Sequence, residues 1–412
     1  MARTQTTTGG RDAAGGLIRG RWALSVGQPQ EPTPTGFTWR LLSDLARLES
    51  GHTPSRKVSA YWDGDVPWIG VRDATAHHGL VIQHTRETVT QQGIANSSAR
   101  VLPQGTVCLS RTASVGYVVM MGRPMATSQD FVNWVCGPDL NPFYLKYILM
   151  LEQDSVRRFA HGTTHQTMYY PEAKALNVLV PDKEEQDRIV GVLGSLDDLI
   201  EVNQRLAVSC EALAIARTER ATGRVALREL AAELRGKTVA PVETTDHYSL
   251  PAFDVDRLPE RLDGSAIKSH KSLLHSPVAL VSRLNPHIPR VWMAYPESGV
   301  LSAASTEFVP LIGSRASVEE VWALCANPGY LDQMNGLVTG TTGSHQRVDK
   351  DALLRLAVPD VTTLPSPERR AIVALVQEAH ASRTAGRDLV RTRDELLPLL
   401  LSGRVSVREV AA

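Results

Sequence analysis

Two long stretches of the chain carry apolar residues at helical spacing. In the first, Ile189, Leu193, Leu196 and Ile200 follow one another at alternating intervals of four and three, which is the period of one face of an α-helix. The second stretch has the same kind of stripe. Its apolar residues include Ile372, Leu375, Leu389 and Leu396. In the first stretch, Leu206 belongs to a second apolar stripe next to the one above. Sustained stripes of this length predict two long helices, over 181–223 and 366–412, that pair as a coiled coil.

The residues that begin these stretches favour the same interpretation. Asp182 is suited to cap a helix, Glu185 follows three positions later, and acidic residues crowd the first turn. Ser366-Pro367-Glu368 gives the second helix a comparable start.

The segments before the two helices have a mixed pattern. Short apolar runs bounded by turn residues predict strands, and a capping residue before an apolar run predicts a helix. The predicted strands cover 66–71, 105–110, 117–121, 131–135, 276–283 and 307–311, and the predicted helices cover 143–159 and 317–325. We therefore expect two mixed α/β domains, over 39–180 and 224–365, and a flexible leader over 1–38 that is rich in Gly, Thr and Pro.

A polar passage occurs once in each half. Gly162-Thr163-Thr164-His165-Gln166 is followed by Pro181-Asp182, and Gly340-Thr341-Thr342-Gly343-Ser344-His345-Gln346 by Pro359-Asp360. Each repeated half of the chain is too long to be one repeat of a solenoid. The fold class expected is α+β: two mixed α/β domains separated by two long antiparallel coiled-coil helices, with a pseudo-two-fold internal repeat. A nearly two-fold chain suits a nearly two-fold partner, of which duplex DNA is the commonest.

The composition narrows the class of protein. Hydrophobic residues make up 42% and charged residues 21%, so the chain can bury real cores. The net charge of zero disfavours a uniformly basic DNA binder but leaves room for a local basic face. The four cysteines lie far apart, without metal-ligand or redox spacing, and are expected to be reduced. No apolar run reaches the roughly 18 residues needed for a membrane span.

Several polar residues are candidates for DNA contacts. Arg111 and Arg283 stand at equivalent strand ends, where each could reach a guanine edge or a phosphate, or serve only the structure. The repeated passage combines a flexible glycine, short donors and a glutamine that can pair with adenine, although an ordinary polar turn would look the same. The candidate DNA-binding residues are Arg111, Thr112, Arg157, Arg158, Thr163, Thr164, His165, Gln166, Arg283, Asn285, Arg290, Thr341, Thr342, His345, Gln346 and Arg347.

No catalytic or metal-binding motif is complete. Asn141-Pro142-Phe143-Tyr144 is similar to a base-flipping motif of adenine methyltransferases, but no glycine-rich cofactor loop accompanies it, and a helix N-cap is the simpler interpretation. His77-His78 is the only adjacent histidine pair and has no third ligand at suitable spacing. We therefore expect no catalytic residue, no metal and no cofactor in this chain.

Taken in order, these features resemble the specificity subunit of type I restriction–modification systems. The matching stretches are Gly51-His52-Thr53-Pro54, the run from Tyr61 to Ile69, Arg111 to Gly116, Pro181 to Val190, and Leu399 to Val405. The resemblance covers roughly residues 39–406.

The resemblance implies a non-catalytic DNA-recognition subunit. Domains 39–180 and 224–365 would each recognise one half of a bipartite target in double-stranded DNA. The helices would fix the gap and dock two modification subunits through Ile189, Leu193, Leu196, Ile200, Leu206, Ile372, Leu375, Leu389 and Leu396. S-adenosylmethionine, ATP and Mg²⁺ would bind to partner subunits and not to this chain. Restriction subunits could join the complex as further members. The complex would work in the bacterial cytoplasm. The alternatives are a self-contained DNA methyltransferase or nuclease, and a coiled-coil scaffold without DNA specificity.

Overall fold

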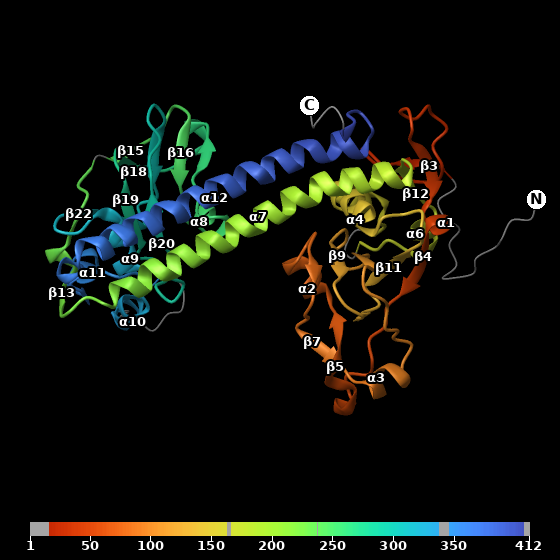
Figure 1. The fold of residues 1–412 in the computed structure, drawn as a ribbon, viewed down its shortest axis with the longest axis horizontal. Coiled ribbons are helices and arrows are strands. Elements are labelled where there is room, and N and C mark those ends of the chain that lie inside the picture. Colours follow the sequence, from red (N-terminus) through yellow and green to blue (C-terminus); the bar gives the residue numbers. More distant parts are fainter. Residues whose placement is uncertain (1–15, 163–165, 237, 338–345, 408–412) are drawn as a thin grey trace, which may run out of the picture. The chain divides into compact units, whose positions relative to one another are not determined.

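A computed structural model describes residues 16–162, 166–236, 238–337 and 346–407 (Figure 1). The chain divides into two compact units, one formed by residues 1–197 and 391–412 and the other by residues 198–390. Each unit contains strands and short helices together with part of two long helices, α7 (Lys183–Thr218) and α12 (Ser366–Leu401). The expected mixed α/β composition is confirmed.

Three sheets of the first unit are described. They have the strand orders β4-β11-β8-β9-β6, β1-β2-β12-β3 and β10-β5-β7. The strands are β1 (Ile18–Arg19), β2 (Leu24–Val26), β3 (Thr38–Leu41), β4 (Ala46–Ser50), β5 (Trp62–Ile69), β6 (Val81–Ile82), β7 (Glu87–Val89), β8 (Val107–Ser110), β9 (Val118–Met121), β10 (Ala126–Thr127), β11 (Phe131–Cys136) and β12 (Leu176–Val180). The helices are α1 (Leu42–Leu45), α2 (Val71–Ala76), α3 (Gln91–Ala95), α4 (Pro142–Leu151), α5 (Gln153–Phe159) and α6 (Tyr170–Lys174), with a 3₁₀ turn at Ser59–Tyr61.

Helix α4 covers β8 and β9 and supplies much of the core of this unit (Figure 1). As expected, Asn141 caps it, since its side-chain oxygen accepts a hydrogen bond from the Phe143 amide at 2.9 Å. The single helix predicted over 143–159 is wrong in one respect. It is two helices, α4 and α5, that meet at Glu152, whose side chain is buried and bonded to the N-terminal segment.

The expectation of a flexible leader up to residue 38 is wrong for residues 16–37. Strand β2 pairs with the outer edge of β12, so the leader adds two strands to the sheet of the first unit. Ala23, Leu24 and Val26 are buried in its core. Burial of these side chains offsets the conformational entropy that the Gly- and Pro-rich leader loses when it becomes ordered. Residues 1–15 lie outside the described residues.

The second unit also has three described sheets. Their strand orders are β13-β23, β14-β22-β19-β20 and β15-β18-β21-β16-β17. The strands are β13 (Arg224–Ala226), β14 (Ala231–Glu233), β15 (Thr238–Val239), β16 (Thr245–Tyr248), β17 (Glu260–Leu262), β18 (Lys271–Leu274), β19 (Val278–Ser282), β20 (Val291–Ala294), β21 (Leu301–Ala304), β22 (Phe308–Gly313) and β23 (Ala357–Pro359). The helices are α8 (Leu250–Val255), α9 (Val318–Cys325), α10 (Pro328–Gly336) and α11 (Lys350–Arg355), with 3₁₀ turns at Leu227–Glu229, Gly264–Ala266 and Val361–Thr363.

Strand β23 follows the polar passage of the second unit, as β12 follows that of the first. Where β12 is paired on both edges, β23 has the single strand partner β13 among the described residues. The side-chain amide of Gln333 takes the place of a second strand, because it donates to the Ala357 carbonyl at 2.9 Å and accepts from the Ala357 amide at 3.1 Å. Pro359, the last residue of β23, has no amide proton to satisfy.

In each unit, α7 and α12 run antiparallel. In the first unit Arg393 of α12 lies 3.0 Å from Asp197 of α7, while Leu397, Leu400 and Leu401 share a core with Ile189 and Leu193. In the second unit Arg383 reaches Glu211, and Glu368 at the other end of α12 reaches Arg217. As predicted, Asp182 caps α7, its side chain accepting from the Glu185 amide at 2.8 Å.

Candidate nucleic-acid interface

The loop after β8 in the first unit lies against Thr167 and Met168, which directly follow the polar passage at 162–166. The Arg111 amide donates to the Asp130 carbonyl at 2.7 Å, and the Arg111 carbonyl accepts from the Met168 amide at 2.9 Å. Thr112 bridges to Thr167, and their hydroxyl oxygens lie 3.1 Å apart. Ala113 turns the loop with a φ of 64°, a conformation that costs an alanine energy and is therefore imposed by these contacts.

The loop after β19 in the second unit repeats this arrangement. The Arg283 amide donates to the Glu307 carbonyl at 3.0 Å, and the Arg283 carbonyl accepts from the Val348 amide at 3.0 Å. Leu284 forms a bridge with Arg347. Asn285 has a φ of 49° and donates its amide to the Gln346 carbonyl at 2.8 Å. In each unit the strand-end loop is thus hydrogen-bonded in the same way to the residues that directly follow the polar passage.

The guanidinium groups at these loops differ in their surroundings. Nε of Arg111 donates to the Gln129 carbonyl at 3.1 Å, and the group lies 4.9 Å from the centre of the Tyr170 ring. Arg347 forms two hydrogen bonds with the Glu307 carboxylate, at 2.6 and 3.0 Å, which raise the pKa of Arg347. Arg283 lies 3.9 Å from the same carboxylate. In the second unit, Arg283 and Arg347 therefore lie around one glutamate, Glu307.

Three other predicted arginines also have protein partners. Arg157 donates to the Val115 carbonyl and to Asp154, and Arg158 donates to the Ser155 hydroxyl at 2.9 Å. Arg290 is nearly buried and forms two hydrogen bonds with Asp254, at 2.7 and 2.8 Å. These bonds lower the pKa of Asp254. Arg290 therefore orders the loop after β19 in this structure, whereas Arg158 keeps much of its guanidinium exposed.

The glutamines at the ends of the polar passages are described. Gln166 is exposed, and Gln346 is half-buried. The remaining predicted residues of the passages, Thr163, Thr164, His165, Thr341, Thr342 and His345, lie outside the described residues.

His161 is a residue of this site that sequence reasoning missed. It forms a bridge with Thr167, which closes the base of the first polar passage. Its Nε2 lies 3.4 Å from an oxygen of Glu172, a carboxylate that is almost fully buried. The position of a histidine directly before Gly162 was the only signal in the sequence, because Glu172 follows on a separate short helix.

The predicted partner-docking positions on the long helices fall into two groups. Ile189, Leu193 and Ile372 are buried in the cores of their own units, so these three predictions are wrong: the side chains attach the helices to the domains. Ile200 is also buried, while Leu196, Leu375, Leu389 and Leu396 are half-buried. Leu206 is exposed. Other exposed apolar residues of α7 are Leu199, Val202, Val208 and Leu213.

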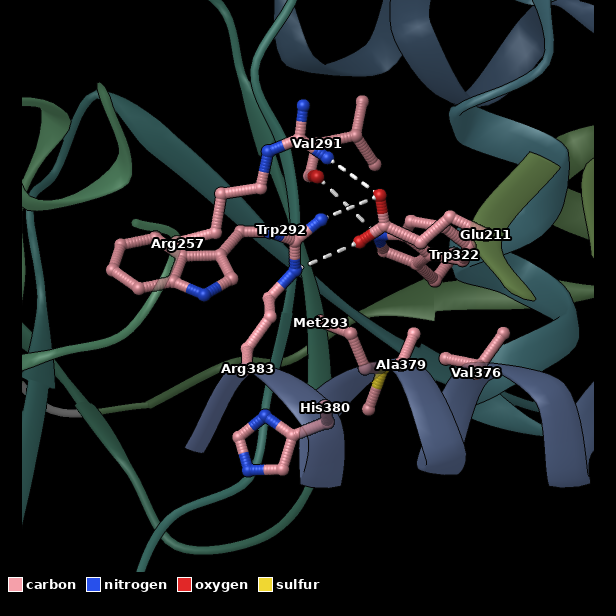
Figure 2. Close-up of a pocket in the computed structure, with 10 residues that line it drawn as sticks. All are labelled: Glu211, Arg257, Val291, Trp292, Met293, Trp322, Val376, Ala379, His380 and Arg383. Atoms are coloured by element: carbon pink, nitrogen blue, oxygen red, sulfur yellow. Dashed lines mark hydrogen bonds and ion pairs between the residues drawn. The ribbon is translucent and has the colours of Figure 1, made fainter. Parts of the chain in front are cut away.

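A charged cluster fixes the second domain to both long helices (Figure 2). Glu211 of α7 lies between Arg257, at 2.7 Å, and Arg383 of α12, at 2.8 Å. The cavity beside Trp322 and His380 measures only about 20 Å³, which is room for about one water molecule. We therefore assign this cluster to attachment of the domain rather than to ligand binding.

The described residues contain no group of three or more His, Cys, Asp or Glu side chains arranged to hold a metal ion. All four cysteines are free thiols, and burial raises the pKa of Cys136 to about 12. The Asn141 side chain is engaged as a cap and as a donor to Asp187 at 2.7 Å, which favours the N-cap interpretation of that motif. In the described part of the chain, no helix has the length and apolar character of a membrane span.

Comparison with known proteins shows which proteins this chain is similar to. Residues 34–211 match the type I restriction modification DNA specificity domain. The type I restriction enzyme MjaIX specificity subunit of Methanocaldococcus jannaschii is 29% identical over 202 residues, which are 48% of this chain and 47% of the relative. The HindI specificity subunit of Haemophilus influenzae is 28% identical over 183 residues, or 42% of this chain and 39% of the relative. The chain thus matches about half the length or less of these curated relatives.

The fold is shared more widely. The crystal structure of a type I restriction–modification S subunit from M. genitalium covers 90% of this chain and 99% of its own length, with a TM-score of 0.58 and 15% sequence identity. The resemblance inferred from the sequence is confirmed: residues 34–211 match the type I DNA specificity domain, and about half of the chain is similar to specificity subunits of type I restriction–modification systems.

Proposed function

We propose that this chain is the DNA-specificity subunit of a type I system and that each mixed domain contacts one half of a bipartite DNA target. The observation that carries the proposal is the shared construction of the two loops. Arg111 and Arg283 stand at equivalent points of two strand-end loops, and each loop is bonded to the residues that directly follow its own polar passage. Two equivalent surfaces on one chain suit the two half-sites of a duplex.

The chemistry of the loops suits base and phosphate recognition. Gln166 and Gln346 can form paired hydrogen bonds with adenine, and arginine can do so with guanine. In the second unit, Glu307 holds Arg347 and lies near Arg283. A phosphate could replace Glu307 as the partner of Arg347, or Glu307 could itself accept a hydrogen bond from a cytosine amino group. Many of the remaining polar contacts of such an interface are expected to position the DNA backbone rather than to read sequence.

The long helices suit the docking of partners and the spacing of the half-sites. Leu199, Val202, Leu206 and Leu213 are exposed and recur on one side of α7. Apolar side chains at helical spacing are the usual anchors for a partner helix. The partners we propose are two modification subunits, which would supply methyl transfer with S-adenosylmethionine, and restriction subunits that use ATP and Mg²⁺. The assembly would act on cytoplasmic DNA.

Two measurements test the proposal. Mapping of methylated bases in cells with and without the gene should reveal a two-part motif with a fixed gap that depends on this chain. The purified chain alone should show no methyltransferase, nuclease or ATPase turnover. Turnover by the isolated chain would instead favour a self-contained enzyme, and the absence of any gene-dependent methylation or sequence-selective duplex binding would favour a scaffold.

A further inference from the structure

The N-terminal segment forms a turn that is built around one buried carboxylate. Glu152 is 1% exposed. Its two oxygens accept hydrogen bonds from the backbone amides of Arg21 at 2.9 Å, Trp22 at 2.5 Å and Ala23 at 2.7 Å. Gly20 is required at the start of the turn, because a Cβ there would lie 2.3 Å from the Leu24 carbonyl oxygen. The backbone that carries Arg21 and Trp22 is therefore held in one position.

Arginine side chains gather around the indole of Trp22. The guanidinium carbon of Arg21 lies 5.2 Å from the ring centre, and that of Arg404, which follows α12, lies 4.9 Å from it. Arg158 of α5 lines the same hollow. All three arginines are exposed. In the described part of the chain, none of the three forms an ion pair with a carboxylate.

The hollow beside Trp22 measures about 450 Å³ and is lined by the N-terminal turn, α5 and the end of α12. Two acidic residues also line it, but each already has an arginine partner. Asp154 lies 3.1 Å from Arg157, and Asp394 lies 2.8 Å from Arg393. The buried charge of Glu152 is bonded to backbone amides. Arg21 and Arg158, which line the hollow, and Arg404, which lies over the Trp22 ring, therefore keep guanidinium groups that no carboxylate of the described residues pairs with.

We propose that this hollow, which we call the Trp22 site, binds the phosphate backbone of DNA next to the half-site that the first unit contacts. Exposed guanidinium groups without carboxylate partners are suited to phosphate oxygens. The hollow is large enough for a sugar–phosphate unit rather than for a lone ion. Contacts to phosphate carry no sequence information directly, so the site adds affinity and not sequence preference.

The position of the site along the chain supports DNA as the source of the phosphate. Arg158 lies in the last turn of α5, and only three residues separate it from Gly162, the first residue of the polar passage. A strand that contacts the passage would therefore pass close to Arg158. The Trp22 site rests on the proposed function in DNA recognition. The experiment therefore uses separate readouts for the Trp22 site and for recognition of the target DNA.

The test compares single substitutions in the full-length chain. Arg21→Gln and Arg404→Gln remove one charge each from the Trp22 site. The matched control is Arg123→Gln, which changes an exposed arginine in the turn between β9 and β10 that has no ion-pair partner among the described residues. The measurement is the affinity for a duplex that contains the mapped target and for a random duplex, at a series of salt concentrations.

Each substitution in the Trp22 site should reduce the slope of log affinity against log salt by about 0.9, the contribution of one phosphate contact. The reduction should be equal on the target and random duplexes, and Arg21→Lys should restore the slope. Arg123→Gln should leave it unchanged. Unaltered slopes in both site variants, with normal binding by the unsubstituted chain, would overturn the Trp22 site alone. A changed target sequence would overturn it as well, since a phosphate contact reads no bases. Failure of the unsubstituted chain to prefer its target duplex would overturn the proposed function instead.

Discussion

The carboxylate of Glu152 accepts a hydrogen bond from the backbone amide of Ala23, a residue 129 positions earlier in the chain, at 2.7 Å. The bond joins the junction of α4 and α5 to the N-terminal strand that completes the sheet around β12. One buried side chain thus fixes both the break between two helices and the position of the leader.

Glu152→Ala should destabilise the first unit by about 3 kcal/mol, since it leaves buried backbone amides without an acceptor, and each such loss costs about 1–3 kcal/mol. Chemical denaturation of the full-length chain measures the change. Asp154→Asn is the control, because that side chain is 91% exposed and its substitution should change the stability by less than about 0.5 kcal/mol. Equal effects of the two substitutions would contradict the assigned role of Glu152.

The sequence predicts the long helices well and the leader poorly, and the reason is physical. The stripes of α7 and α12 are local patterns that repeat over many turns, and the caps of α7 at Asp182 and of α4 at Asn141 are encoded by adjacent residues. Strands β1 and β2 have two and three residues. Their stability comes from the edge of β12 and from Glu152, which are distant in the sequence. No local pattern contains that information.

The candidate DNA-binding site could be predicted from the sequence only in part. The repeat located both polar passages and both strand-end arginines, because equivalent positions share residue types. It could not show that Arg290 is held by Asp254, 36 residues away, or that Glu307 binds Arg347. Those pairings depend on which side chains the sheets bring together. The burial of Ile189 and Ile372 was hidden for a related reason, since a helical stripe does not reveal which of several neighbours it faces.

The stability of the second unit should fall as the pH drops below the ordinary pKa of histidine. His380 packs against the Tyr295 ring at 4.6 Å, and burial, followed by the charges of Arg383 and Arg387, lowers its pKa in the folded chain. The unfolded chain then binds a proton at about pH 6.5 that the folded chain resists, so the free energy of unfolding decreases as pH falls through that value.

His380→Gln should flatten this part of the pH dependence, measured by denaturant unfolding between about pH 7.5 and pH 5. His270→Gln, at an exposed position, serves as the comparison. An unchanged pH profile in His380→Gln would show that other groups cause the acid sensitivity.

Gln166→Ala and Gln346→Ala should each alter one half of the recognised DNA sequence and leave the other half intact. The two residues belong to separate compact units, and a good paired hydrogen bond to a base contributes about 1–3 kcal/mol of discrimination. Methylated-motif mapping with each variant measures the outcome. A shift of both half-sites by a single substitution would show that the two units do not read DNA separately.

The gap between the half-sites should respond to the length of the helix pair. Four residues inserted in α7 after Gln204, together with four in α12 after Leu389, lengthen both helices between the ion pair Asp197–Arg393 and the ion pair Glu211–Arg383. Four residues add about 6 Å at 1.5 Å per residue and are close to one helical turn. The apolar stripes therefore stay nearly in register, and both ion pairs can still form.

The expected result is an active subunit whose motif keeps both halves and has a gap longer by roughly two base pairs, at about 34–36 Å per 10–10.5 base pairs. Insertion of one residue at each of the same positions is the control. It rotates the following part of each helix by about 100° and moves its apolar stripe away from its contacts, so methylation should be lost rather than re-spaced. If the four-residue variant methylates DNA with the original gap, the helices do not set the spacing, and the two domains must be positioned on DNA by another part of the assembly.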